Sequence, residues 1–63
     1  MTRKERLAAA AVRAGRDMVR AAAEHGIDSA TTRLAAAVAD RATTAAEAAG
    51  CTAADYAHAR RTA

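Results

Sequence analysis

Alanine at helical spacing, with no proline to interrupt it, is the feature that most constrains how this chain can fold. Alanine accounts for 23 of the 63 residues, and proline is absent. Alanine is the best helix former because it has no side-chain entropy to lose, and proline is the residue that breaks helices. No segment has the pattern of a strand. We therefore predict an all-α protein, a small bundle of three to four helices forming a single domain over residues 1–63.

The first predicted helix is long and has clear ends. Apolar residues recur at helical spacing from about Thr2 to His25, with charged residues on the opposite face. Gly26 is a typical helix stop, and Asp28 or Ser29 would cap the helix that follows.

The central helix allows two interpretations. It either runs unbroken from Ala30 to about Ala49, or it breaks near Thr43-Thr44 into helices over 30–42 and 45–49. Paired β-branched residues are poor helix interior, and Thr44 with Glu47 three residues later matches a capping box. We favour the break on these local signals.

A last short helix is expected after Gly50. Thr52 would cap its free amides, and Asp55 would complement the helix dipole. The helix would continue to about Arg61.

Bulky apolar residues are too few to build a large core. Eight are available: Leu7, Val12, Met18, Val19, Ile27, Leu34, Val38 and Tyr56. A domain of this size has little stability to spare, so we expect a partner, either a second copy in a homo-oligomer or a larger protein assembly. The apolar stripe of the first helix is the expected interface, formed by Leu7, Ala11, Val12, Gly15, Met18 and Val19.

The charge balance favours an anionic partner. Ten Lys or Arg against seven Asp or Glu give a net charge of +3, which suits nucleic acid; the alternative is a solvated, salt-bridged helix face. On the first helix the candidate phosphate contacts are Arg3, Lys4, Arg6 and Arg16.

Residues 44–61 resemble the helix-turn-helix family of DNA-binding domains. The resemblance rests on a small residue at Ala46, a turn at Gly50, an apolar residue at Cys51 and a cap at Thr52. It implies that the last helix enters the major groove of DNA. The residues it implies as contacts, together with the cap, are Thr52, Ala53, His58, Arg60 and Arg61.

Other classes of function lack sequence support. There is no Ser/His/Asp grouping and no glycine-rich phosphate loop, and Cys51, His25 and His58 do not have zinc-ligand spacing. We therefore expect no enzyme activity, no cofactor, no metal and no small-molecule substrate. With one cysteine and no apolar run of membrane-spanning length, we expect a cytoplasmic protein without a membrane partner.

Two functions follow from these observations: a small helix-turn-helix DNA-binding regulator, or an alanine-lined helical module that self-assembles or docks on a larger protein or ribonucleoprotein. The segment around Thr43-Thr44 discriminates between them. A kink with two short, steeply crossing helices favours DNA binding, and one straight helix through Glu47 favours the interaction module.

Overall fold

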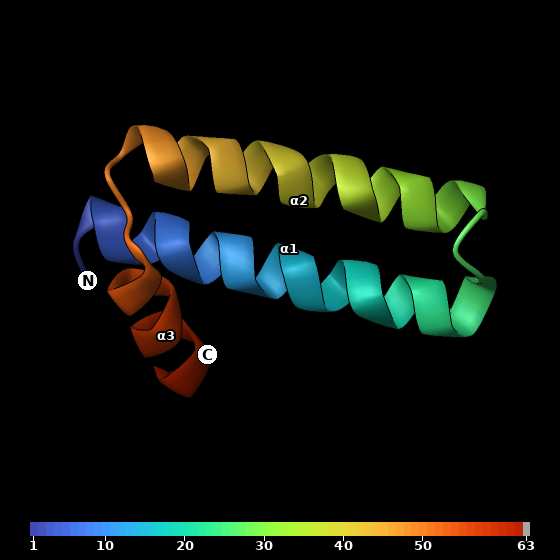
Figure 1. Cartoon of the computed structure of the whole chain (residues 1–63), viewed down its shortest axis with the longest axis horizontal. Coiled ribbons are helices and arrows are strands. Elements are labelled where there is room, and N and C mark those ends of the chain that lie inside the picture. The colour runs from blue at the N-terminus through green and yellow to red at the C-terminus, as the bar shows by residue number, and fades with distance from the viewer. Residues whose placement is uncertain (63) are drawn as a thin grey trace.

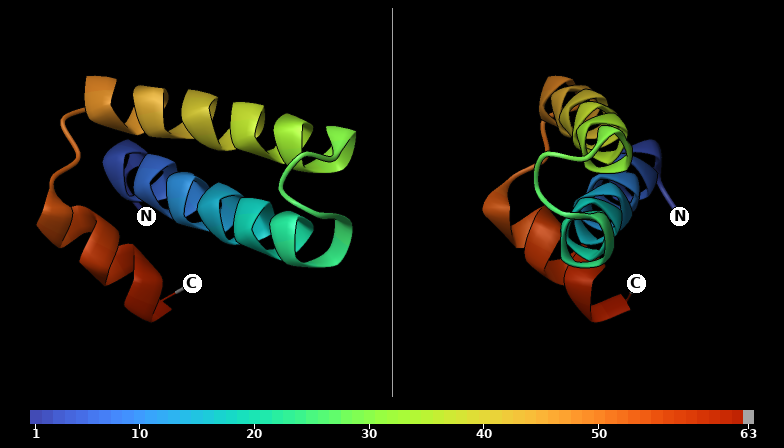
Figure 2. Two further views of the ribbon diagram at one scale, coloured as in Figure 1. Left: turned by 45° about the vertical axis from the view of Figure 1, so that its right-hand side comes forward. Right: turned by 90° about the vertical axis from the view of Figure 1, so that its right-hand side faces the viewer.

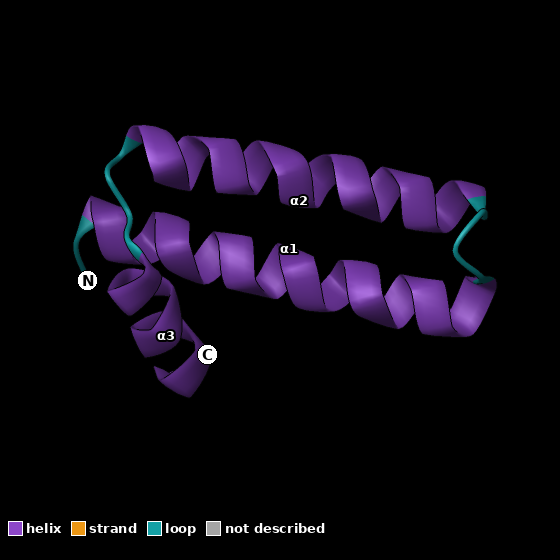
Figure 3. Cartoon of the chain, viewed as in Figure 1, coloured by secondary structure: helices purple, strands orange, loops and turns teal. Residues whose placement is uncertain are grey.

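A computed structural model describes residues 1–62 and contains three helices, α1 (Arg3–His25), α2 (Ala30–Ala48) and α3 (Ala53–Thr62). The predicted all-α fold is confirmed, and the described residues contain no strand (Figure 3). α1 and α2 form an antiparallel hairpin, and α3 lies against the N-terminal half of α1 on the side away from α2 (Figures 1 and 2). α2 and α3 each pack on α1, while their described residues make no close backbone contact with each other.

The ends of α1 follow from local chemistry. The Thr2 hydroxyl accepts a hydrogen bond from the Glu5 backbone N–H at 3.1 Å, and the Glu5 carboxylate accepts one from the Thr2 N–H at 3.2 Å. This reciprocal capping box satisfies two amides at the helix start. Gly26 ends the helix with φ of 88°, a conformation that glycine adopts without a Cβ penalty.

The cap of α2 is Ser29, one of the two predicted candidates. Its hydroxyl accepts a hydrogen bond from the Thr32 N–H at 3.1 Å. The Thr32 side chain is only 5% exposed, and its hydroxyl donates to the Gly26 carbonyl at 2.7 Å. Thr32 therefore ties the connection between α1 and α2 to the start of α2 without leaving a buried hydroxyl unpaired.

The predicted break near Thr43-Thr44 is wrong, because α2 is continuous through both threonines. Each threonine costs only a few tenths of a kcal/mol relative to alanine inside a helix. An unbroken helix keeps Ala39 and Ala46, seven residues apart, on one face, and both are buried. Tertiary packing along this face outweighs the local capping signal of Thr44.

The turn after α2 forms at Gly50, as predicted. Gly50 has φ of 88°, and the Cys51 N–H donates to the Ala46 carbonyl at 3.0 Å, the six-residue bond of a Schellman motif. The predicted capping of α3 by the Thr52 side chain does not occur. Both its N–H and its hydroxyl donate to the Asp55 carboxylate, at 2.7 and 3.0 Å, so Asp55 is the acceptor at this helix start.

The core consists of alanine methyl groups. The buried apolar residues are Ala8, Ala9, Ala11, Ala14, Ala21, Ala39, Ala46 and Ala59, and no large side chain is fully buried. None of the eight bulky candidates is in the buried class, and Ile27, Leu34, Val19 and Val38 are between 54% and 78% exposed. Small side chains let the helices approach closely, but they leave most of the bulky apolar surface in water.

Candidate functional site

A groove opens along α1 where α3 stops covering it. α3 packs on the first half of α1, so the second half is flanked by α2 alone (Figures 1 and 2). The groove has a volume of about 690 Å³ and is open to solvent. We call it the α1 groove; its lining residues are Ala11, Val12, Gly15, Arg16, Met18, Val19, Arg20, Ala23, Thr43, Tyr56 and Arg60.

The floor of the α1 groove has the least side-chain volume at Gly15. A Cβ added to Gly15 would meet nothing within 4 Å. A second hollow, of about 570 Å³, shares Gly15, Met18 and Thr43 with the α1 groove and extends it between α1 and α2. Asp40 also lines the second hollow, so a carboxylate lies beside the α1 groove.

Five of the six predicted interface residues lie together in this groove: Ala11, Val12, Gly15, Met18 and Val19. Leu7 is half-buried and does not line the groove. Four of the lining residues were not among the predicted site residues. Arg20 and Ala23 continue the same helical spacing and could have been included, whereas Thr43 and Tyr56 come from other helices and required the tertiary structure.

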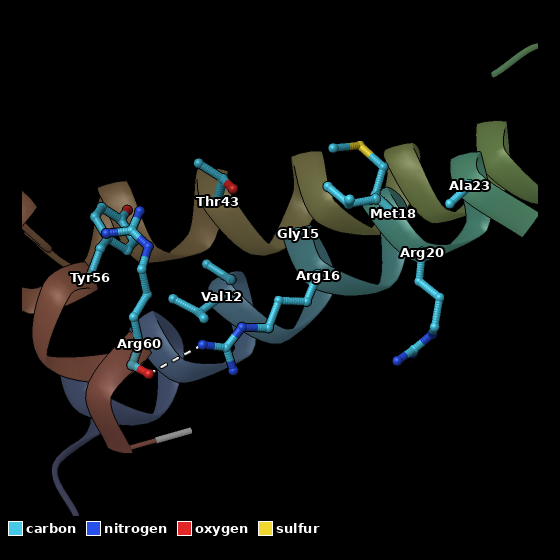
Figure 4. A pocket seen from close by; sticks show the side chains of 11 residues that line it. Val12, Gly15, Arg16, Met18, Arg20, Ala23, Thr43, Tyr56 and Arg60 are labelled. Atoms are coloured by element: carbon cyan, nitrogen blue, oxygen red, sulfur yellow. Dashed lines mark hydrogen bonds between the residues drawn. The ribbon is translucent and has the colours of Figure 1, made fainter.

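Tyr56 closes the groove at the α3 end (Figure 4). Its hydroxyl is buried and has no hydrogen-bond partner among the described residues. Burial raises the pKa of the Tyr56 hydroxyl above 10.0, and the negative charge that Cys51 and Glu47 can carry adds to the shift. The phenol therefore stays protonated at physiological pH.

Arginine side chains line the edge of the groove. The Arg16 guanidinium donates a hydrogen bond to the Arg60 carbonyl at 3.1 Å, which links α1 to the last turn of α3 (Figure 4). The Arg60 side chain extends toward Tyr56, and Arg20 forms an ion pair with Asp17. No carboxylate from the described residues lines the α1 groove.

The start of α3 lies against the first turn of α1, near some of the predicted nucleic-acid contacts, whereas Arg16 lies farther along α1 and lines the α1 groove. Lys4 lies 3.3 Å from the Asp55 carboxylate, and the Cys51 thiol donates to the Lys4 carbonyl at 3.4 Å. These contacts place the start of α3 against the first turn of α1. The predicted contact residues are all exposed: Arg3, Lys4, Arg6, Arg16, Thr52, Ala53, His58, Arg60 and Arg61.

The first turns of α1 and α3 also carry acidic groups, Glu5 and Asp55. Hydrogen bonds from the Thr2 backbone and hydroxyl lower the pKa of Glu5, and those from Thr52 and Lys4 lower the pKa of Asp55. Both carboxylates are therefore charged at neutral pH. Arg6 is also engaged locally, because its guanidinium donates to the Met1 carbonyl at 3.0 Å. Lys4 and Arg6 thus have internal partners, while the side chains of Arg3 and Arg61 make no hydrogen bond or ion pair within residues 1–62.

Comparison with known proteins returned no matching family model, no matching curated protein and no matching solved structure. Within residues 1–62, no group of three or more His, Cys, Asp or Glu side chains is placed to hold a metal ion. None of the described helices combines the length and the apolar character needed to cross a membrane.

Proposed function

We propose that this protein is a non-enzymatic interaction module that docks on another protein chain through the apolar surface of its helical hairpin. The observation that carries the proposal is that small apolar residues are buried while several large ones are exposed. Alanines and Thr32 occupy the interior, while Val19, Leu34 and Val38 are more than half exposed. Leu34 and Val38 lie four residues apart on one face of α2, and Val19 lines the α1 groove. Exposed apolar residues that gather on a surface mark binding sites.

The straight course of α2 also favours this function. α2 passes through Thr43 and Thr44 without a break and ends beyond Glu47. It lies along α1 as the second rod of a hairpin, and α3 packs on α1 rather than on α2. A long, smooth hairpin with an open groove suits side-by-side packing with a further helix.

Site-specific photocrosslinking in cells tests the proposal. A photoreactive residue at position 19, in the α1 groove, should yield an adduct with a protein, either a second copy or a different chain. The same residue at position 48, which is exposed and outside the groove, is the matched control. If position 19 gives no more protein adduct than position 48, the docking function is wrong.

We propose, second, DNA binding through exposed basic residues of α1 and α3, among them Arg3, Arg60 and Arg61. It is supported by the resemblance of residues 44–61 to helix-turn-helix domains and by the exposure of these side chains. Arg60→Ala with Arg61→Ala should weaken duplex binding and lower the salt slope by up to about 2, since each phosphate contact contributes roughly 0.9.

The matched control for that test is Arg33→Ala with Arg41→Ala, which removes the same charge from exposed positions on α2. Fluorescence anisotropy at several salt concentrations gives both the affinity and the slope. Equal losses in the two double variants would mean that only net charge matters, and the recognition role of α3 would be rejected.

A further inference from the structure

We infer that the α1 groove binds a small, neutral and mostly apolar molecule whose hydrogen-bond acceptor pairs with the Tyr56 hydroxyl. This site goes beyond the docking function and does not depend on it, although a bound ligand would compete with a protein partner for the groove. The volume of the groove, about 690 Å³, is the first argument. Pockets that bind small molecules span roughly 300–1,000 Å³ and combine an apolar lining with a few polar groups.

The Tyr56 hydroxyl is the second argument, because it is a buried donor that the protein itself leaves unpaired. It is shielded from solvent and has no hydrogen-bond partner among the described residues. Such a group costs free energy and therefore needs an explanation. Burial raises the pKa of this hydroxyl above 10.0, so it keeps its proton and can donate to an acceptor. A water molecule would need several polar partners at once, whereas the groove surface is mostly apolar.

The rest of the groove provides room for an apolar body. Val12, Met18 and Val19 line it, and a Cβ added at Gly15 would meet nothing within 4 Å. Tyr56 lies at the α3 end of this surface (Figure 4). A ligand that lies along α1 can therefore bury its apolar part over Gly15 and direct an acceptor toward the phenol.

Access to the hydroxyl requires one neighbouring side chain to move. The Arg60 side chain is exposed and extends toward Tyr56 (Figure 4). Within residues 1–62, the Arg60 guanidinium makes no hydrogen bond or ion pair, and only its backbone carbonyl is engaged. The Arg60 side chain can therefore change rotamer without breaking a polar contact.

The charges around the groove favour a neutral ligand over an ion. Arg16 and Arg20 both have internal partners. Arg60 is positive, but Asp40 lines the adjoining hollow, and Glu47 is close enough to the phenol to raise its pKa. Because charges of both signs surround the site, neither an anion nor a cation gains a clear advantage there.

A matched pair of probes tests the acceptor. Benzophenone has two aromatic rings joined by a carbonyl group, and diphenylmethane has the same rings joined by a methylene group. Amide shifts of the full chain, followed by NMR titration, give the affinity for each probe. We expect benzophenone to bind about three- to tenfold more tightly, as one neutral hydrogen bond allows.

Variants assign this binding to the groove and to the hydroxyl. Tyr56→Phe keeps the ring and should abolish the preference for benzophenone. Gly15→Leu should fill the groove and weaken both probes at least about tenfold, whereas Ala48→Leu adds the same side chain at an exposed position outside the groove and should have no effect. Arg60→Ala should retain benzophenone binding, because the ligand carries no charge.

The remaining outcomes overturn the inference in distinguishable ways. Equal affinity for the two probes would reject the acceptor, and a preference that survives Tyr56→Phe would reject the hydroxyl as its donor. Tighter binding of a benzophenone carboxylate, lost in Arg60→Ala, would make the ligand an anion. Absence of binding by any probe would reject the site. The docking function is judged separately, by photocrosslinking at position 19, and stands or falls independently of these results.

Discussion

At the scale of single residues, Tyr56 is the described side chain whose burial is least compensated by hydrogen bonding. It is the only aromatic residue of the chain, and its ring closes the end of the α1 groove. Its buried hydroxyl has no partner among the described residues. A buried hydroxyl without a hydrogen bond costs free energy that the ring alone would not incur.

Removing this hydroxyl should not harm the fold. We expect Tyr56→Phe to be neutral or to stabilise the protein by up to about 1 kcal/mol, since the ring keeps its packing and the desolvated group is lost. Urea denaturation followed by circular dichroism measures the effect. Tyr56→Ala is the control and should destabilise the protein, because the packing of the ring is lost as well. A clear loss of stability in Tyr56→Phe would mean that the hydroxyl has a partner.

At the scale of elements, α3 depends on what fixes it to α1. It has 10 residues, fewer than the roughly 12–15 that an isolated helix needs to persist in water. Ala59 buries its methyl group, and Asp55 links the Thr52 amide and hydroxyl to the Lys4 ammonium. The position of α3, and with it one wall of the α1 groove, therefore rests on a small number of contacts.

Attachment of α3 should depend on pH through Asp55. Its pKa is lowered below 3.8 in the folded protein, chiefly by the Thr52 backbone N–H. The stabilisation is therefore complete above the unfolded pKa and is lost as the pH falls through the folded value. We expect Asp55→Asn to speed amide hydrogen exchange in α3 at neutral pH, and to differ little from the unchanged protein at pH values well below 3.8.

Asp40→Asn is the matched control, because it removes the same charge from an exposed position on α2. It should leave α3 exchange unchanged at every pH. Equal exchange in the Asp55→Asn variant and the unchanged protein at neutral pH would show that Asp55 does not help to hold α3, which the packing of Ala59 and the hydrogen bond from Arg16 to the Arg60 carbonyl would then fix.

At the scale of the whole molecule, the distribution of side-chain volume is the reverse of the usual one. Ala46 is fully buried at 0% exposure, whereas Leu34 is 69% exposed and Val38 54%. The alanine interior sets the separation of α1 and α2. Leu34 and Val38 therefore lie mostly in contact with water rather than in the interior.

The stability of the fold should therefore depend more on the buried alanines than on the exposed large residues. Ala46→Leu should destabilise the protein by about 1–3 kcal/mol, because the added methyl groups force the helices apart. Leu34→Ala with Val38→Ala should change stability by no more than about 0.5 kcal/mol per site, as expected for exposed positions. Urea denaturation at low protein concentration gives both values. A large loss from the second variant that grows with protein concentration would instead assign Leu34 and Val38 to a contact between copies.

What could be predicted from the sequence depended on how far apart along the chain the interacting residues lie. The stops at Gly26 and Gly50 and the cap at Ser29 are contacts between residues a few positions apart, so the pattern along the chain predicts them. The break at Thr43-Thr44 failed because its capping signal is equally local, while the burial of Ala39 and Ala46 against α1 is not.

The sequence by itself determined that this protein is helical and where most of its helices end, because helix propensity and capping act within one or two turns. The tertiary structure alone decided which alanines are inside and where α3 packs. An alanine methyl fits a core or a surface almost equally well, so its periodicity does not select a buried face. Only the docking of α3 on the first half of α1 places Tyr56 and Arg60 in the same groove as Gly15 and completes the α1 groove.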